Sequence, residues 1–65
     1  MIPFNKINIG DVFYSPWTGS DILYTVVDKD KDSKLIKIRL SYQHPTLPKT
    51  FWKKYTDRIF THKVK

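Results

Sequence analysis

Residues 36–42 have the sequence IKIRLSY, in which every second side chain is aliphatic or aromatic. Ile36 and Ile38 would lie on one face of a strand, and Lys37 and Arg39 would lie on the other. A period of two predicts a strand with one buried face and one face in water. This stretch therefore indicates a β-sheet protein.

The composition of the whole chain agrees with that prediction. Of its 65 residues, 17 are Ile, Val or Thr, which fit the pleated surface of a sheet, and none is Ala or Glu, which favour helices. Four Phe, four Tyr and two Trp supply the bulk of a small core. We therefore expect one all-β domain over residues 1–65, with residues 1–8 as an irregular N-terminal segment.

Turn-forming residues separate the predicted strands. Pro16 and Gly19 follow the first strand, and Pro45 and Pro48 follow the third. Between the second and third strands, residues 28–33 (DKDKDS) are expected to form a charged hairpin tip. The strands with clear bounds are residues 12–15, 22–27, 35–42 and 59–64.

Residues 50–57 are expected to form one short helical turn before the last strand. Thr50 is a candidate N-cap, and Phe51, Tyr55 and Ile59 recur every four residues, as on one face of a helix. The complete prediction is a small five-stranded SH3-like barrel. Its predicted core consists of Val12, Tyr24, Val26, Ile36, Ile38, Leu40, Phe51 and Phe60.

Three short motifs carry a resemblance to a known class of proteins. GDVF at residues 10–13 and YTVV at residues 24–27 precede the aromatic FWKKY at residues 51–55. In this order they resemble small SH3-like proteins of bacteriophages and mobile elements, over about residues 9–64. The resemblance implies the barrel fold, while the functions within that class are diverse. An OB-type barrel is the main alternative, although its five-stranded core usually needs a longer chain.

The formal charge of +6 is concentrated in the second half of the chain. Residues 1–33 carry −2 and residues 34–65 carry +8. A basic half is typical of proteins that bind nucleic acid, although lysine-rich surfaces also occur without such a partner. We predict a basic module that binds DNA or RNA with little sequence specificity. The predicted contacts are Lys37, Arg39, Lys53, Lys54 and Arg58 for phosphates, with Trp17 and Trp52 for base stacking.

Each of the two tryptophans has an alternative interpretation that the sequence leaves open. Trp52 would instead cap the barrel core, and Trp17 would instead fold back from its turn-rich loop. The alternative function is that of a protein-binding accessory factor, encoded by a phage or mobile element, which inhibits or modulates a host enzyme. Its aromatic contact patch would contain Trp17, Tyr42, Pro45 and Pro48.

The sequence offers little for catalysis or metal binding. Asp28, Asp30 and Asp32 match the opening of a calcium loop, but Ser33 and Arg39 stand where such a loop needs Gly and Glu. His44 and His62 have no metal-ligating partner at a suitable spacing, and the chain has no cysteine. We therefore expect no enzymatic activity, no cofactor, no metal and no small-molecule substrate.

The location of the protein is also an expectation from sequence. The longest apolar run has three residues, against about 20 for a membrane-spanning helix. The first eight residues lack the apolar stretch of a signal peptide. We expect a soluble cytoplasmic protein with no membrane partner, and the resemblance to phage proteins implies an infected bacterial host.

Overall fold

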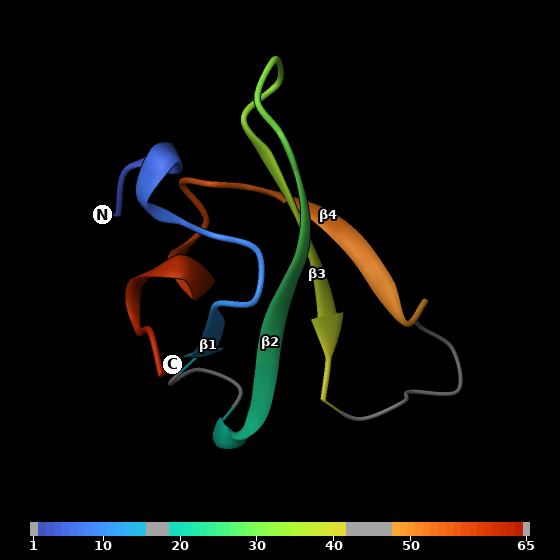
Figure 1. Cartoon of the computed structure of the whole chain (residues 1–65). Helices are drawn as coiled ribbons and strands as arrows, with labels where there is room; N and C mark the ends of the chain where they lie inside the picture. Colours follow the sequence, from blue (N-terminus) through green and yellow to red (C-terminus); the bar gives the residue numbers. More distant parts are fainter. Residues whose placement is uncertain (1, 16–18, 42–47, 65) are drawn as a thin grey trace.

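Four strands of the computed structural model pair in chain order as one antiparallel sheet, which confirms the prediction of a mostly β protein (Figure 1). The structure describes residues 2–15, 19–41 and 48–64. No helix in this part of the chain is long and apolar enough to cross a membrane. The elements are η1 (Phe4–Lys6), β1 (Val12–Ser15), β2 (Gly19–Asp30), β3 (Leu35–Leu40), β4 (Thr50–Lys54) and η2 (Arg58–Thr61), where η denotes a 3-10 helix.

The long strand β2 contains one extra residue, Val27. Val26 pairs with Ile38 of β3, whereas Asp28 pairs with Lys37, so Val27 has no partner on β3. A bulge of this kind makes the side chains beyond it exchange faces. As a result, the side chains of β2 that face the core are Val26 before the bulge and Lys29 after it.

Beyond the bulge, the lysine of the DKD sequence points inward. Lys29 pairs with Ile36, which is fully buried, and it is itself partly buried. Asp28 and Asp30 are exposed on the other face. The bulge therefore sorts the alternating charges of the hairpin by sign, with the carboxylates outward.

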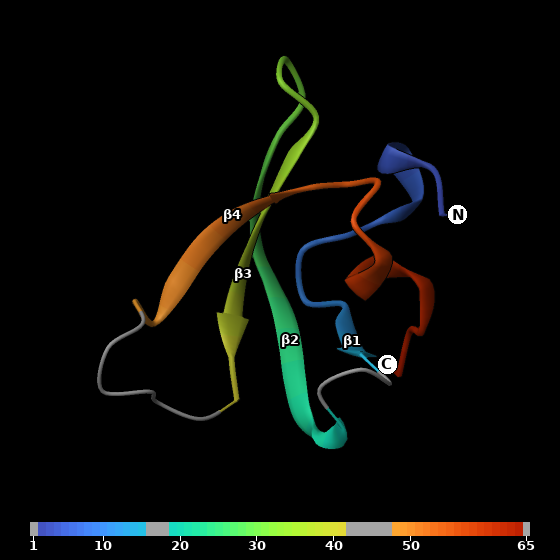
Figure 2. The same ribbon diagram turned by 180° about the vertical axis from the view of Figure 1, so that it is seen from behind.

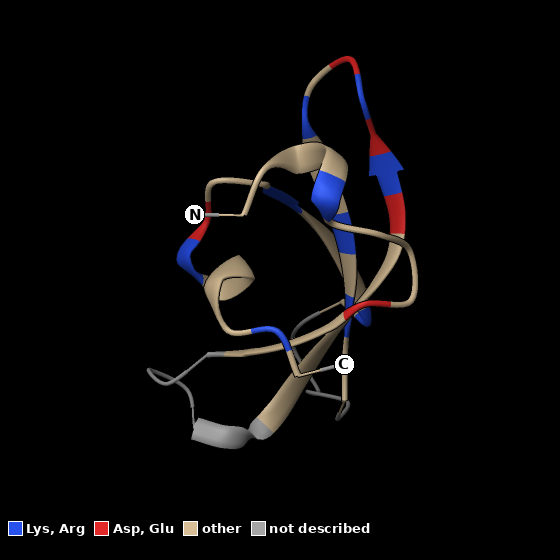
Figure 3. Ribbon diagram, turned by 60° about the vertical axis from the view of Figure 1, so that its left-hand side comes forward, with Lys and Arg blue, Asp and Glu red and all other residues tan. Residues whose placement is uncertain are grey.

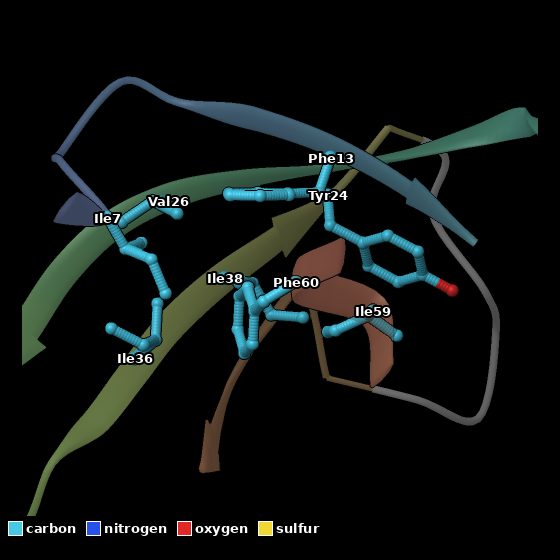
Figure 4. Close-up of a cluster of buried hydrophobic side chains, with 8 residues drawn as sticks. All are labelled: Ile7, Phe13, Tyr24, Val26, Ile36, Ile38, Ile59 and Phe60. Carbon is cyan, nitrogen blue, oxygen red and sulfur yellow. The ribbon is translucent and has the colours of Figure 1, made fainter. Parts of the chain in front are cut away.

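The core lies between the inner face of the sheet, the N-terminal segment and η2 (Figure 4). Five of the eight predicted core residues are buried, and Leu40 and Phe51 are partly buried against them. Val12 is wrong, because its neighbour Phe13 is the inward residue of β1 and packs edge-on against Phe60 at 5.4 Å between ring centroids. Among the described residues, the buried hydrophobic set is Ile7, Phe13, Tyr24, Val26, Ile36, Ile38, Ile59 and Phe60.

The N-terminal segment, expected to be irregular, contains η1 and a hydrogen-bonded turn. Gly10, at φ +98°, is the third residue of a turn that the Asp11 amide closes on the Asn8 carbonyl at 3.0 Å. A positive φ at this position is what a type II turn requires, so glycine fits it. The turn brings the chain back over the sheet, and Ile7 becomes fully buried.

The expected helical turn at residues 50–57 is wrong, because residues 50–54 form β4. The register pairs Trp52 with Lys37 and Phe51 with Ile38. Burial alternates accordingly, with Trp52 exposed and Phe51 facing the core. The spacing of four between aromatic residues suggested a helix, but the hydrogen bonds of the neighbouring strand and the β-forming Thr and aromatic residues outweigh it.

The expected last strand at residues 59–64 is wrong over its first half. Ile59 and Phe60 are consecutive and both buried, which an alternating strand does not allow. Asp57 instead caps η2, since its carboxylate accepts a hydrogen bond from the Ile59 amide at 3.1 Å. After η2 the chain runs beside β1, and Lys63 forms an isolated antiparallel bridge with Phe13 (Figure 2).

Candidate nucleic-acid interface

Adjacent strands β3 and β4 place six side chains on the face of the sheet that points away from the core. The register sets Lys37 directly opposite Trp52, and the pairs two residues away in each direction lie on the same face. We call this set the outer platform. Its members are Leu35, Lys37 and Arg39 from β3 and Thr50, Trp52 and Lys54 from β4.

Trp52 is the centre of the outer platform. Trp52 is 43% exposed and lies on the face opposite to Phe51, so the alternative that it caps the core is wrong. The ammonium nitrogen of Lys37 lies 5.8 Å from the centroid of the indole ring, within the range of a cation–π contact. A large aromatic surface is thus kept in solvent with a cation directly beside it.

Two further cations complete the outer platform. Lys54 follows Trp52 by two residues on the same face, and Arg39 lies diagonally across from Trp52; both are exposed. Strands β3 and β4 contain no Asp or Glu. On the neighbouring strand β2, Asp28 is the partner of Lys37, so a carboxylate borders the platform on that side.

Two of the predicted phosphate contacts lie elsewhere. Lys53 pairs with Ile36 on the inner side of the sheet, where its ammonium nitrogen lies 4.0 Å from the Asp57 carboxylate and 5.6 Å from the Phe51 ring. Arg58 is exposed on η2. Strand alternation therefore separates Lys53 from Lys54, although the two are adjacent in sequence.

Most of the alternative protein-binding patch cannot be placed. Trp17, Tyr42 and Pro45 lie outside the described residues, as does His44, and Pro48 is exposed before β4. The other histidine, His62, packs on Tyr14 with 5.2 Å between ring centroids. Among the described residues, no group of three or more His, Cys, Asp or Glu side chains could hold a metal ion.

The lysines of the β2–β3 hairpin are not among the site residues predicted from the sequence. Figure 3 shows Asp and Lys alternating along this hairpin, which looks neutral when the charges are only counted. The Asp30 carboxylate accepts hydrogen bonds from the Asp32 amide at 3.1 Å and the Ser33 amide at 3.5 Å. Bonding to the Ser33 side chain, and then to these amides, holds the pKa of Asp30 below its ordinary value. That carboxylate is therefore engaged in the turn, while Lys29 reaches the N-terminal segment.

Comparisons of the chain with known protein families, curated proteins and solved structures found no match. The function is therefore inferred from the geometry of this chain alone.

Proposed function

We propose that the protein is a non-enzymatic module that binds single-stranded nucleic acid on the outer platform. The observation that supports this proposal is the exposed Trp52 ring, with Lys37 at 5.8 Å and two further cations on the same face. Phosphates need cations, and unpaired bases need an aromatic surface on which to stack. The outer platform supplies both within two adjacent strands.

The chemistry of the platform favours single strands and little sequence specificity. An indole ring stacks on any base that is not already paired. Lysine acts toward phosphate as a point charge, and the platform has no Asn or Gln to read base edges. Binding energy would thus come from stacking and from phosphate contacts, which all sequences offer.

We also propose that the fold is a small SH3-like barrel, in keeping with the resemblance to phage proteins. The support is the path of the C-terminal segment, which follows a 3-10 helix and runs antiparallel to β1. The Tyr14 amide donates to the His62 carbonyl at 3.0 Å, and the Val64 amide donates to the Val12 carbonyl at 2.7 Å. A fifth strand in this position would join the last segment to the first strand.

The test is to measure the affinity for fluorescent 20-nucleotide single strands by anisotropy at low salt, with Trp52→Ala as the main variant. Loss of one stacked base costs about 1–3 kcal/mol, so the affinity should fall about 5- to 150-fold. The variant should stay folded, since Trp52 is 43% exposed. A duplex of the same sequence should bind the native protein more weakly than the single strand.

Lys6→Gln is the matched control, because Lys6 is an exposed residue of η1 and not part of the outer platform. It should bind nearly as the native protein does. An absence of binding at low salt, or an unchanged affinity in a folded Trp52→Ala variant, would refute the proposal. A protein partner that survives nuclease treatment of a lysate would then favour the host-protein alternative.

A further inference from the structure

A pocket of about 470 Å³ lies at the end of the β2–β3 hairpin, on the side of the core. It is lined by Phe4 and Asn5 from η1 and by Lys29, Lys31 and Lys34 from the hairpin. Its volume is in the range of small-molecule sites. Because the register directs Lys29 inward with Ile36, this pocket and the outer platform lie on opposite faces of the sheet. We call it the lysine pocket.

Two of the ammonium groups converge on one aromatic ring. The Lys29 nitrogen lies 4.4 Å from the centroid of Phe4, and the Lys34 nitrogen lies 5.0 Å from the same centroid. Lys29 also donates to the Phe4 carbonyl at 3.0 Å. An ammonium group has three N–H donors, so Lys29 keeps two for a ligand while the carbonyl fixes its position.

The carboxylates of the hairpin, Asp28, Asp30 and Asp32, form no ion pair with these cations. Asp28 is exposed on the opposite face, and the Asp30 carboxylate bonds to the amides of the turn. Among the side chains that the structure describes, the ion pairs are Lys53–Asp57 and Lys63–Asp11, and neither includes a pocket lysine. Three lysines thus line one concave surface without an ion-pair partner among the described residues.

We propose that the lysine pocket is a second binding site, for a small ligand that bears a di- or triphosphate group. Three lysines match the charge of a polyphosphate better than that of a single phosphate. Their flexible stems can also follow its rotating oxygens, as point charges do. The Phe4 ring, which rests edge-on against Tyr55 at 5.9 Å between centroids, forms a rigid wall on which the cations are held. This site is separate from the proposed nucleic-acid platform.

Inorganic pyrophosphate is the first probe, titrated into the ¹⁵N-labelled full chain and followed by NMR at low salt. Amide resonances of Asn5 and of residues 29–35 should shift and saturate. Sulfate at equal ionic strength should bind about tenfold more weakly, because it carries fewer charges. Equal effects of the two anions, or no saturable shift, would overturn the proposal.

Lys34→Gly is the decisive variant because it removes a pocket cation at a position where the backbone suits glycine. Lys34 has φ 60°, a left-handed conformation that glycine adopts without strain. The variant should melt at the same or a higher temperature and bind pyrophosphate about fivefold more weakly or worse. Lys49→Gln, an equal loss of charge at an exposed position outside the pocket, is the control and should bind as the native protein does. If pyrophosphate affinity fell equally in both variants, the cause would be the lower net charge of the protein, and the proposed site would be refuted.

Pyrophosphate could also mimic the backbone of a bound nucleic acid, and competition distinguishes these sources. A single strand bound at the outer platform should stay bound while pyrophosphate fills the lysine pocket, since the two lie on opposite faces. Displacement of the strand would show that the pocket belongs to the nucleic-acid path and would overturn a separate small-ligand site.

Discussion

The outer platform and the lysine pocket use the same chemistry, lysine beside an aromatic ring, yet they are assembled in different ways. On the platform, strand pairing alone sets Lys37 across from Trp52. In the pocket, a bulge turns Lys29 inward, where it meets Phe4 from a segment 25 residues earlier in the chain. Regular alternation makes the first arrangement visible in sequence, whereas the second depends on an irregularity and a tertiary contact.

The largest expected difference is in stability, between substitutions on the two faces of β3. Ile38 is fully buried and Arg39 is exposed, although they are adjacent. Ile38→Ala should cost about 2–5 kcal/mol of unfolding free energy, because the cavity adds to the lost burial, and most of so small a domain should then be unfolded at 37 °C. Arg39→Ala should change the stability by less than about 0.5 kcal/mol. Thermal unfolding of both variants checks this, and similar melting temperatures would contradict the assignment of faces.

A smaller difference is expected in the salt dependence of binding, between substitutions of Lys54 and of Lys53. Lys54 belongs to the outer platform, whereas Lys53 is on the inner side beside Asp57. Lys54→Gln should reduce the slope of log K against log salt for single strands by about 0.7, the contribution of one phosphate contact. Lys53→Gln should leave the slope nearly unchanged. The measurement is a series of anisotropy titrations over salt concentration, and equal slopes in the two variants would mean that strand alternation does not select the contacts.

The smallest effect should come from the hairpin turn. The pKa of Asp30 is lowered in the folded protein, so its ionised form adds stability at a pH above the unfolded value of about 3.9, and that gain is lost as the pH falls through the folded pKa. Asp30→Asn should therefore melt slightly below the native protein at pH 7, and the difference should vanish in acid. Asp32→Asn, at the exposed neighbouring position, is the control. A difference that persists at low pH would mean that the charge of Asp30 is not responsible.

Sequence patterns predicted the parts of the fold that repeat with a regular period. The alternation around Ile36 and Ile38 identified β3 and its two faces correctly. The same reasoning failed at residues 50–54, because aromatic residues four apart fit a helix and a strand equally well until a pairing partner is known. It also failed for Ile59 and Phe60, since burial of two consecutive residues depends on η2 and its Asp57 cap.

The two candidate sites also differ in how far the sequence predicts them. The sequence supplied Lys37, Arg39, Lys54 and Trp52, which strand pairing brings together. It could not supply the lysine pocket, because the charges of residues 28–34 sum to zero. The signal that could have indicated it is the odd fit of the DKDKD stretch to the apolar alternation of β2, which only a bulge resolves.

The unpaired Val27 determines which of the residues that follow it in β2 face the core. If Val27 instead paired with Lys37 in a regular ladder, Asp28 would lie opposite Ile36 and Lys29 would face outward opposite Leu35, with no substitution anywhere. A carboxylate would then stand beside Phe4, and the positive charge that lines the concavity would fall. Gain or loss of this bulge could therefore change the ligand preference of related proteins without any change in the sequence of the hairpin.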